Sequence, residues 1–319
     1  MSTSRTGLPG DDRSRATLAA LAPEPPAWAV EHFAEALRGR TELDGWRLIG
    51  TEIPDCASFD APALERAVAD AYRVVAESLR ASGHHPVRFW NFVPGIHADM
   101  ADGRDRYMVF NAGRYNAFEE WFGQAALFRR TVPTASAVGI GSGALAIYAL
   151  GGRGTGLPVE NPRQVPAYSY SARYGKLPPC FARGTIVRGL PLGPGGPGRP
   201  GDGGDAPVLL VGGTASIVGE DSLHDRDARQ QALETFENLA ELVAAARRQV
   251  HGQQAVADAP RAAFDAFTDL RVYIVRDTDA PLLREMVTER FGRTARIEFA
   301  QADLCRRELL VEIEGLATL

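Results

Sequence analysis

The sequence predicts an α/β (α+β) protein made of two related units, each a mixed sheet with helices packed on one face. The chain has 319 residues, which is enough for two modest domains with a sizeable core. Helical and strand-like apolar patterns alternate along it. One order of elements, helix–strand–helix–strand–strand, occurs twice. We interpret this repetition as a duplication, although coincidence among common elements would give the same order.

The first occurrence lies in a predicted N-terminal unit of residues 26–152. Apolar residues on one face predict a helix over residues 61–82, with Asp60 as its N-cap. The elements expected after it are a strand at 87–96, a helix near 105–122, and strands at 135–140 and 145–150.

The second occurrence lies in a predicted C-terminal unit of residues 153–319. Ala232, Phe236, Leu239 and Val243 share one face of a helix predicted near 227–249. A later helix, near 280–291, is expected to begin with Asp279 as its cap and Pro281 in its first turn. The predicted strands of this unit are 270–275, 296–300 and 308–314.

The composition of two segments indicates that they cannot bury enough apolar surface to fold. Residues 1–25 are rich in Ser, Arg, Pro and Gly and predict a disordered N-terminal tail. Residues 191–206 form a Gly/Pro-rich stretch that predicts a flexible loop. Because strand-like runs flank this loop, we expect a long hairpin connection rather than a domain linker.

Composition and motifs exclude several classes of function. With 35 basic and 40 acidic residues, the net charge of −5 argues against a nucleic-acid partner. There is no apolar run of transmembrane length and no secretory signal pattern, so we expect neither a membrane partner nor export. Three widely spaced cysteines favour a reduced, cytoplasmic compartment. No metal-ligand spacing, phosphate loop or dinucleotide fingerprint occurs, and we expect no cofactor and no metal.

The closing strand, residues 308–314, carries carboxylates in an apolar pattern. Alternation places Leu310, Glu312 and Glu314 on one face. Carboxylates on so apolar a strand are costly unless they are paired, solvated or protonated, and such a cost is often accepted at acid–base sites. An edge strand with its glutamate face in water would explain the same pattern.

Further polar clusters suggest a small anionic ligand. Arg106, Asn111 and Arg114 could form an anion pocket, since guanidinium groups bind carboxylates in a bidentate manner. A prolyl loop over residues 160–183 is dense in tyrosine and arginine, which suits a polar wall around an anion. The small residues of 212–219 permit close approach of a backbone to a ligand. These residues predict a cofactor-free site for a small anion, with Glu312 as acid or base.

The chain resembles a known family, the chorismatases. The resemblance covers about residues 45–319 and rests on several long runs in the right order: Arg88–Ile96, Tyr107–Arg114, Glu160–Pro162, Phe181–Arg183, Gly213–Gly219 and Leu309–Gly315. Chorismatases cleave pyruvate from chorismate, a dicarboxylate with an enol ether. The resemblance implies this small-molecule substrate and a RidA/YjgF-like fold for the C-terminal unit.

The resemblance also implies roles for single residues. Glu312 matches the catalytic acid, Arg183 and Arg114 match arginines on the substrate carboxylates, and Tyr170 and Tyr174 match pocket tyrosines. Gln231 matches a polar residue on the helix after the glycine-rich strand, and the resemblance implies that it binds the substrate. The chain departs from the family at Gly219–Ser222, where many members have Gly-His.

Two positions bear on the product. The hydrolytic branch of the family usually has alanines where this chain has Gly213 and Cys305, so the resemblance favours 3-hydroxybenzoate plus pyruvate. Hydrolysis to a dihydroxycyclohexadienoate and mixed 3- and 4-hydroxybenzoate formation stay open as alternatives. So do two hypotheses from other classes, a RidA-like imine deaminase and a non-catalytic small-anion binding protein. Monomer and homotrimer stay undecided.

Overall fold

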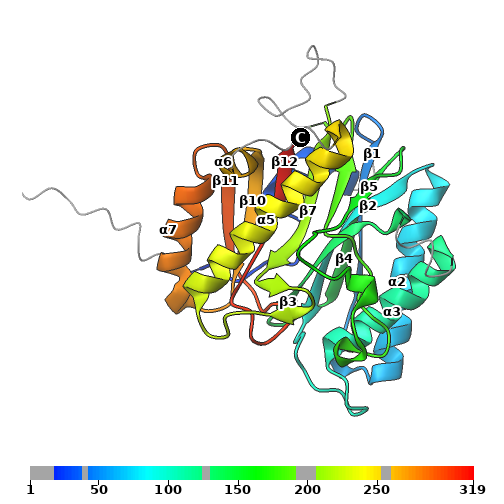
Figure 1. Ribbon diagram of the computed structural model, residues 1–319. Coiled ribbons are helices and arrows are strands. Elements are labelled where there is room, and N and C mark those ends of the chain that lie inside the picture. Colours follow the sequence, from blue (N-terminus) through cyan, green and yellow to red (C-terminus); the bar gives the residue numbers. More distant parts are fainter. Residues whose placement is uncertain (1–17, 38–41, 124–129, 192–205, 253–259) are drawn as a thin grey trace, which may run out of the picture.

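Figure 1 shows the computed structural model of the protein, which describes residues 18–37, 42–123, 130–191, 206–252 and 260–319. Within these ranges the chain forms a four-stranded sheet, a six-stranded sheet and a small two-stranded hairpin. Both large sheets are mixed, because each contains one parallel pair among antiparallel ones. The predicted fold class is therefore confirmed.

The four-stranded sheet has the strand order β1-β4-β2-β3. The longest helix of this half is α2, and Asp60 is its N-cap, as predicted. The Asp60 side chain accepts a hydrogen bond from the Ala63 N–H. The elements are α1 (Ala27–Leu37), β1 (Trp46–Ile53), α2 (Ala61–Ala81), β2 (His85–Pro94), α3 (Arg106–Phe122), β3 (Thr134–Ile140) and β4 (Leu145–Gly152).

The six-stranded sheet has the order β11-β10-β12-β7-β6-β5. A loop with two short 3-10 helices, Ala167–Ser169 and Ala172–Tyr174, joins β5 to β6. The remaining elements are β5 (Leu157–Val159), β6 (Gly184–Val187), β7 (Val208–Ala215), β8 (Ile217–Val218), β9 (Asp221–Ser222), α5 (Ala228–His251), α6 (Pro260–Phe264), β10 (Phe267–Ile274), α7 (Ala280–Phe291), β11 (Arg296–Gln301) and β12 (Val311–Thr318).

The two sheets repeat one topology. In the first, β2 is parallel to β3 and antiparallel to β4, and β1 adds to β4. In the second, β10 is parallel to β11 and antiparallel to β12, and β7 adds to β12. A helix, α3 or α7, joins each parallel pair, as such pairs require a crossover. The predicted duplication of element order is thus present in the strand pairing as well.

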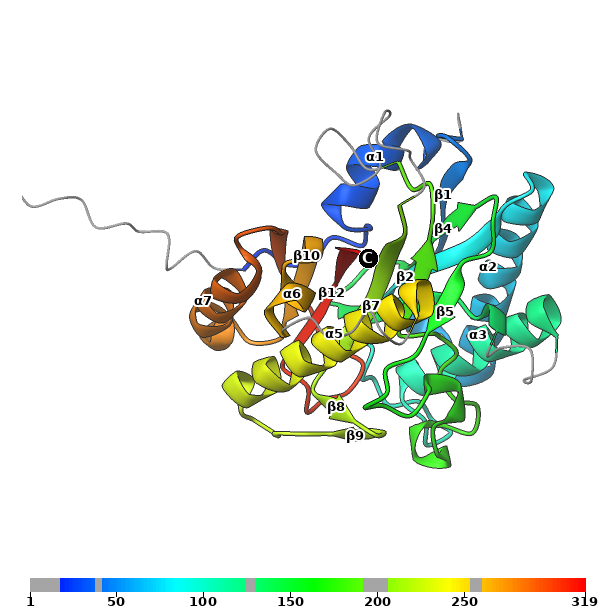
Figure 2. The same ribbon diagram turned by 45° about the horizontal axis from the view of Figure 1, so that its top comes forward.

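The sheets lie face to face between two outer helical layers, with α2 and α3 on one side and α5, α6 and α7 on the other (Figures 1 and 2). A core of buried residues fills the seam between the sheets and includes Trp90 and Leu150 from the first and Leu210, Tyr273 and Leu316 from the second. Polar side chains on these inner faces therefore meet away from water.

Several expectations need correction. Residues 1–17 of the predicted tail lie outside the described residues, but Leu18 is buried and Ala20 pairs with Gln301 at the edge of the six-stranded sheet, so a disordered tail to residue 25 is wrong. Asp279 does not cap α7 with its side chain, which accepts a hydrogen bond from Arg276 instead. The closing strand begins at Val311, later than expected, and it is central rather than an edge strand.

The Gly/Pro-rich stretch falls mostly on residues 192–205, which lie outside the described residues. The strands on either side of it, β6 and β7, pair antiparallel, which confirms the hairpin connection. As for membrane crossing, none of the helices in the described part of the chain has the length and apolar character required.

Candidate active site

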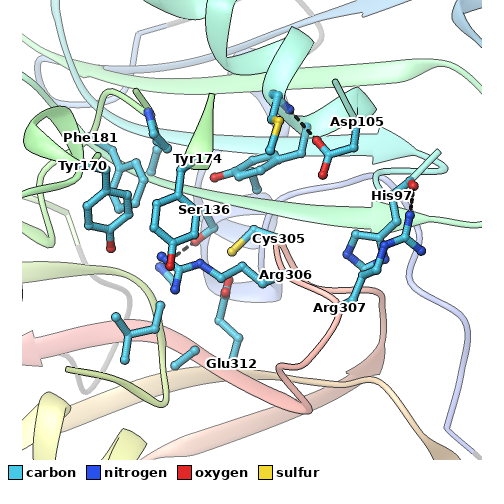
Figure 3. A pocket seen from close by; sticks show the side chains of 18 of the residues that line it. His97, Asp105, Ser136, Tyr170, Tyr174, Phe181, Cys305, Arg306, Arg307 and Glu312 are labelled. Atoms are coloured by element: carbon cyan, nitrogen blue, oxygen red, sulfur yellow. Dashed lines mark hydrogen bonds between the residues drawn. The ribbon is translucent and has the colours of Figure 1, made fainter. Parts of the chain in front are cut away.

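A cavity of about 250 Å³ lies at the seam between the two sheets. Its walls come from both halves, because β3 and α3 of the first meet β7, β12 and two loops of the second. In Figure 3, Cys305, Arg306 and Glu312 approach one space, with Tyr170, Tyr174 and Phe181 to one side. The predicted residues that line this cavity are Arg114, Tyr170, Tyr174, Arg183, Gly213, Cys305 and Glu312.

Glu312 is a carboxylic acid held away from water. Its strand, β12, lies between β10 and β7, and only 4% of the residue is exposed. Among the described residues, its Oε1 atom has no hydrogen-bond partner. Burial, and then the negative charge of Glu314, raise the pKa of Glu312 to about 8, against the opposing charges of Arg88 and Arg183. At neutral pH this side chain is therefore a proton donor.

Gly213 makes the room that the acid occupies. A Cβ atom on this residue would lie 2.1 Å from Oε1 of Glu312, far inside van der Waals contact. Glycine at this point of β7 thus allows the carboxyl group to lie flat against the neighbouring backbone. Any larger residue would displace the proposed acid.

Glu314 is the opposite case, a buried carboxylate with every partner it needs. It pairs with Arg88 at 2.6 Å and accepts a hydrogen bond from the Tyr273 hydroxyl at 2.9 Å. The Ser136 hydroxyl also donates to Glu314 and accepts from the Gly213 N–H. This network joins the two sheets under the cavity floor and fixes a negative charge near Glu312.

Three buried arginines give the cavity its positive charge. Arg114, Arg183 and Arg306 are exposed by 1%, 4% and 9%, and none forms an ion pair with the described residues. The Nε atoms of Arg114 and Arg183 are buried and have no hydrogen-bond acceptor there. Unpaired buried cations are costly, so an anionic ligand is the partner that this arrangement accommodates.

Aromatic rings hold these arginines apart. The guanidinium of Arg183 lies over the rings of Phe181 and Tyr170, and that of Arg306 lies 4.0 Å from the Tyr174 ring centroid. Cys305 lies beside them. Burial, with the charge of Glu312, raises the pKa of the Cys305 thiol to about 12, so it is neutral at physiological pH.

Comparison with known proteins now decides the family. Residues 35–151 match the family described as chorismatase FkbO/Hyg5-like, N-terminal. A 3-hydroxybenzoate synthase from Streptomyces hygroscopicus is 36% identical over 77% of this chain and 67% of the relative. The chain belongs to the chorismatase family. A chorismatase from Streptomyces rapamycinicus is 33% identical over 72% of this chain and 63% of its own length. The crystal structure of a chorismatase matches with a TM-score of 0.71 and 28% identity, over 87% of this chain and 76% of the other.

Gln231 is one chorismatase position that the structure places elsewhere. It is not among the residues that line the cavity, and its expected contact with substrate stays a prediction. Its amide oxygen accepts from the Leu310 N–H at 2.7 Å and its NH₂ group donates to the Glu308 carbonyl at 2.8 Å. Gln231 therefore fixes the chain that leads into β12. Arg106 is likewise absent from the cavity lining and donates to the Pro94 and Ala57 carbonyls.

The departure from the chorismatase pattern at Gly219–Ser222 lies behind the cavity wall, in contact with the lining residues Tyr174 and Arg306. The Glu220 side chain accepts hydrogen bonds from the Ser171 N–H and hydroxyl. Its backbone carbonyl accepts from the Tyr174 hydroxyl and from Arg306. The hairpin β8–β9 thus anchors the tyrosine-rich loop.

Sequence reasoning missed Ser136 and Arg306. Ser136 lies within the apolar run of β3, where a serine gives no signal of its own. Arg306 follows Cys305 in an irregular loop with no periodicity to show which way its side chain points. The one available signal was its place next to Cys305 and six residues before Glu312.

Proposed function

We propose that this chorismatase converts chorismate to 3-hydroxybenzoate and pyruvate, with Glu312 as the acid. One observation carries the proposal: a carboxyl group that keeps its proton to about pH 8 shares a cavity with three buried arginines that lack carboxylate partners. Chorismate has two carboxylates for the arginines and an enol ether for the acid. The similarity to a 3-hydroxybenzoate synthase supports the product.

In the first step, Glu312 gives its proton to the methylene carbon of the enol ether. The ether oxygen then carries positive charge, and its bond to the ring carbon weakens. Glu312 becomes a carboxylate at the moment when cationic character develops beside it. A neutral donor suits this step, because substrate binding brings two further negative charges into the cavity and disfavours an ionised Glu312.

In the second step, the substrate's own 4-hydroxyl oxygen bonds to the neighbouring ring carbon as pyruvate leaves with the ether oxygen. The bond from the hydroxyl oxygen to C4 then breaks. The neighbouring ring carbon, which now bears this oxygen, loses its proton as the ring aromatises. One proton is added to the substrate and one is removed, so no water is consumed. The Glu312 carboxylate formed in the first step can accept the released proton.

Cys305 is the residue proposed to favour this internal route over attack by water. As a neutral thiol it is a small, weakly polar surface, and it shapes or polarises the pocket without acting as a nucleophile. Packing alone would explain a cysteine of this size as well. Cys305→Ala separates the two roles, because only a steering role predicts a change in the products.

The test is incubation of the purified protein with chorismate and identification of the products by chromatography. We expect equimolar 3-hydroxybenzoate and pyruvate. A dihydroxycyclohexadienoate would assign the protein to the hydrolytic route instead. Binding of chorismate without consumption would leave an anion-binding protein and overturn the proposal.

A further inference from the structure

Part of the loop that joins β5 to β6 separates the cavity from solvent by a single layer of residues. Tyr170 and Tyr174 line the cavity, and their ring centroids lie 5.1 Å apart (Figure 3). Between them in the sequence, residues 171–173 are exposed. The regular structure around this segment is limited to two 3-10 helices of three residues each. Its position over the cavity therefore depends on contacts with other elements.

Glu220, at the turn between β8 and β9, supplies the main contacts. Its carboxylate accepts hydrogen bonds from the Ser171 N–H at 2.8 Å and from the Ser171 hydroxyl at 2.7 Å. We call this pairing of Glu220 with Ser171 the latch. Hydrogen bonds to a charged acceptor are stronger than those between neutral groups. The nearby ion pair of Arg173 with Asp221 is largely exposed, by 48% and 62%, and such pairs contribute little.

The hairpin end of the latch is fixed independently of the loop tip. The Gly219 N–H donates to the Arg163 carbonyl, and the Gly219 carbonyl accepts from the Val165 N–H, both at 2.8 Å. Arg306 donates to the Glu220 carbonyl and to the Ser222 hydroxyl, each at 2.9 Å. Loss of the latch would therefore release the loop tip and leave the hairpin in place.

Water that enters the cavity would change the product. Protonation of the enol ether makes the carbon that bears the side-chain carboxylate electrophilic. Water adds to this carbon and loses a proton, and the bond from the carbon to the ether oxygen then breaks as that oxygen takes up a proton. Pyruvate leaves, the ether oxygen stays on the ring, and one water is consumed. The result is a dihydroxycyclohexadienoate, whereas the internal route to 3-hydroxybenzoate consumes no water.

We propose that Glu220 is a positioning residue that determines the product. By holding Ser171, it keeps the tyrosine-bearing loop closed over the cavity, so that bulk water does not compete with the internal displacement of pyruvate. This role rests on the proposed function. It differs from that of Cys305, because Glu220 is not among the residues that line the cavity and acts through the loop.

The first measurement is the ratio of the two ring products formed from chorismate. Glu220→Ala removes both acceptors of the latch. Ser171→Pro removes both donors, and the φ of −65° at Ser171 and ψ of 148° at Tyr170 suit a proline. In each variant the ratio of dihydroxycyclohexadienoate to 3-hydroxybenzoate should rise about tenfold, the effect of one charge-assisted hydrogen bond on closure. Glu220→Gln retains one acceptor oxygen and should raise it only about 2- to 3-fold.

The second measurement is solvent access to the cavity, which does not depend on the reaction. Cys305 is the cysteine of the cavity lining, while Cys56 and Cys180 have no exposed surface. Labelling of Cys305 by N-ethylmaleimide, located by peptide mass spectrometry, should be about tenfold faster in Glu220→Ala and Ser171→Pro than in the wild type. Circular dichroism checks that both variants are folded.

Asp225→Ala is the matched control. This variant removes a carboxylate from the connection that follows β9, where Asp225 is 65% exposed and pairs with Arg226 rather than with the loop. Both the product ratio and the labelling rate should stay at the wild-type values. A change as large as that in Glu220→Ala would show that surface charge, and not the latch, sets the product ratio.

Faster labelling without a change in the product ratio would overturn the role of Glu220 in product choice. Equal loss of both products without faster labelling would overturn the latch itself. The proposed function fails separately, if the wild type forms mostly the dihydroxycyclohexadienoate. The product role of Glu220 would then fail with it, and the labelling rates alone would decide whether the latch closes the cavity. If the wild type forms 3-hydroxybenzoate and the variants match it in both measurements, the reaction stands and the latch is wrong.

Discussion

Strands β4 and β12 occupy the same position in the two halves of the molecule, yet their inward faces differ completely. Each lies second in the order β1-β4-β2-β3 or β7-β12-β10-β11. On β4, Ala146 and Leu150 point into the seam between the sheets and are fully buried in its apolar core. On β12, Glu312 and Glu314 take comparable places and are equally hidden. A duplicated topology thus provides the frame, and two carboxylates in one copy make the site.

Replacement of Glu312, the carboxyl group that distinguishes β12 from β4 most, should have the largest effect on activity. Glu312→Gln keeps the shape but cannot donate an acidic proton, and we expect kcat to fall about 10²- to 10⁴-fold. Product formation from chorismate measures this directly, and circular dichroism checks the fold. Near-normal turnover would show that the difference between the two strands is not catalytic.

The next largest effect concerns the second carboxylate and its partner. Glu314→Leu leaves Arg88 buried without a counter-charge, and the unfolding free energy should fall by about 3–5 kcal/mol. The double variant Arg88→Met/Glu314→Leu makes β12 resemble β4. We expect it to be more stable than either single variant in urea denaturation, since a buried ion pair often contributes little beyond its apolar replacement. A double variant less stable than both would indicate that the pair is needed for folding.

A third comparison uses pH, because the inward face of β4 carries no carboxyl group. In the proposed mechanism protonated Glu312 is the active form, so kcat/KM should stay level below about pH 8 and fall about tenfold per pH unit above it. The folded protein keeps this proton while the unfolded chain loses it near pH 4.5, so the unfolding free energy should fall as pH rises between these values. Glu312→Gln should remove that contribution to the slope.

The smallest effect should come from two glycines on the strands beside β4 and β12. A Cβ on Gly50 would meet the Tyr148 ring at 2.5 Å, and one on Gly213 would meet Glu312 at 2.1 Å. Gly213→Ala should displace the acid from its preferred geometry and lower kcat about 2- to 10-fold. Gly50→Ala disturbs a ring far from the cavity lining and should leave kcat unchanged. Similar losses in both variants would contradict a specific role for Gly213.

Much of the fold could be predicted because it depends on local patterns. The apolar periodicity of α2 and its Asp60 cap depend only on residues that are close in the sequence. The repeated order of elements was sufficient to suggest two related sheets. The packing of one sheet on the other, which buries Glu314, was not predictable in this way, because its partner Arg88 is 226 residues away.

The residues of the candidate site also divide into those that local sequence indicates and those that depend on distant contacts. Glu312, Arg183 and Gly213 lie in recognisable runs of sequence, and the cavity brings them together. The bonds of Gln231 to the backbone of Leu310 and Glu308 could not be predicted, because they join segments far apart in the sequence. Arg306 was missed because the direction of a loop side chain is decided by the rings that receive it, here Tyr170 and Tyr174.

The position of the cavity at the seam has a consequence for how the protein loses activity. Neither half alone encloses Glu312, since β3 closes over it from one side and β7 and β12 hold it from the other. A slight parting of the sheets would let water reach the carboxyl group, and its pKa would return toward the ordinary value. The proton would then be lost at neutral pH while both sheets stayed folded. Enzymatic turnover should therefore act as a gauge of how tightly the two halves are docked, and it should fail in mild denaturant before any change in secondary structure.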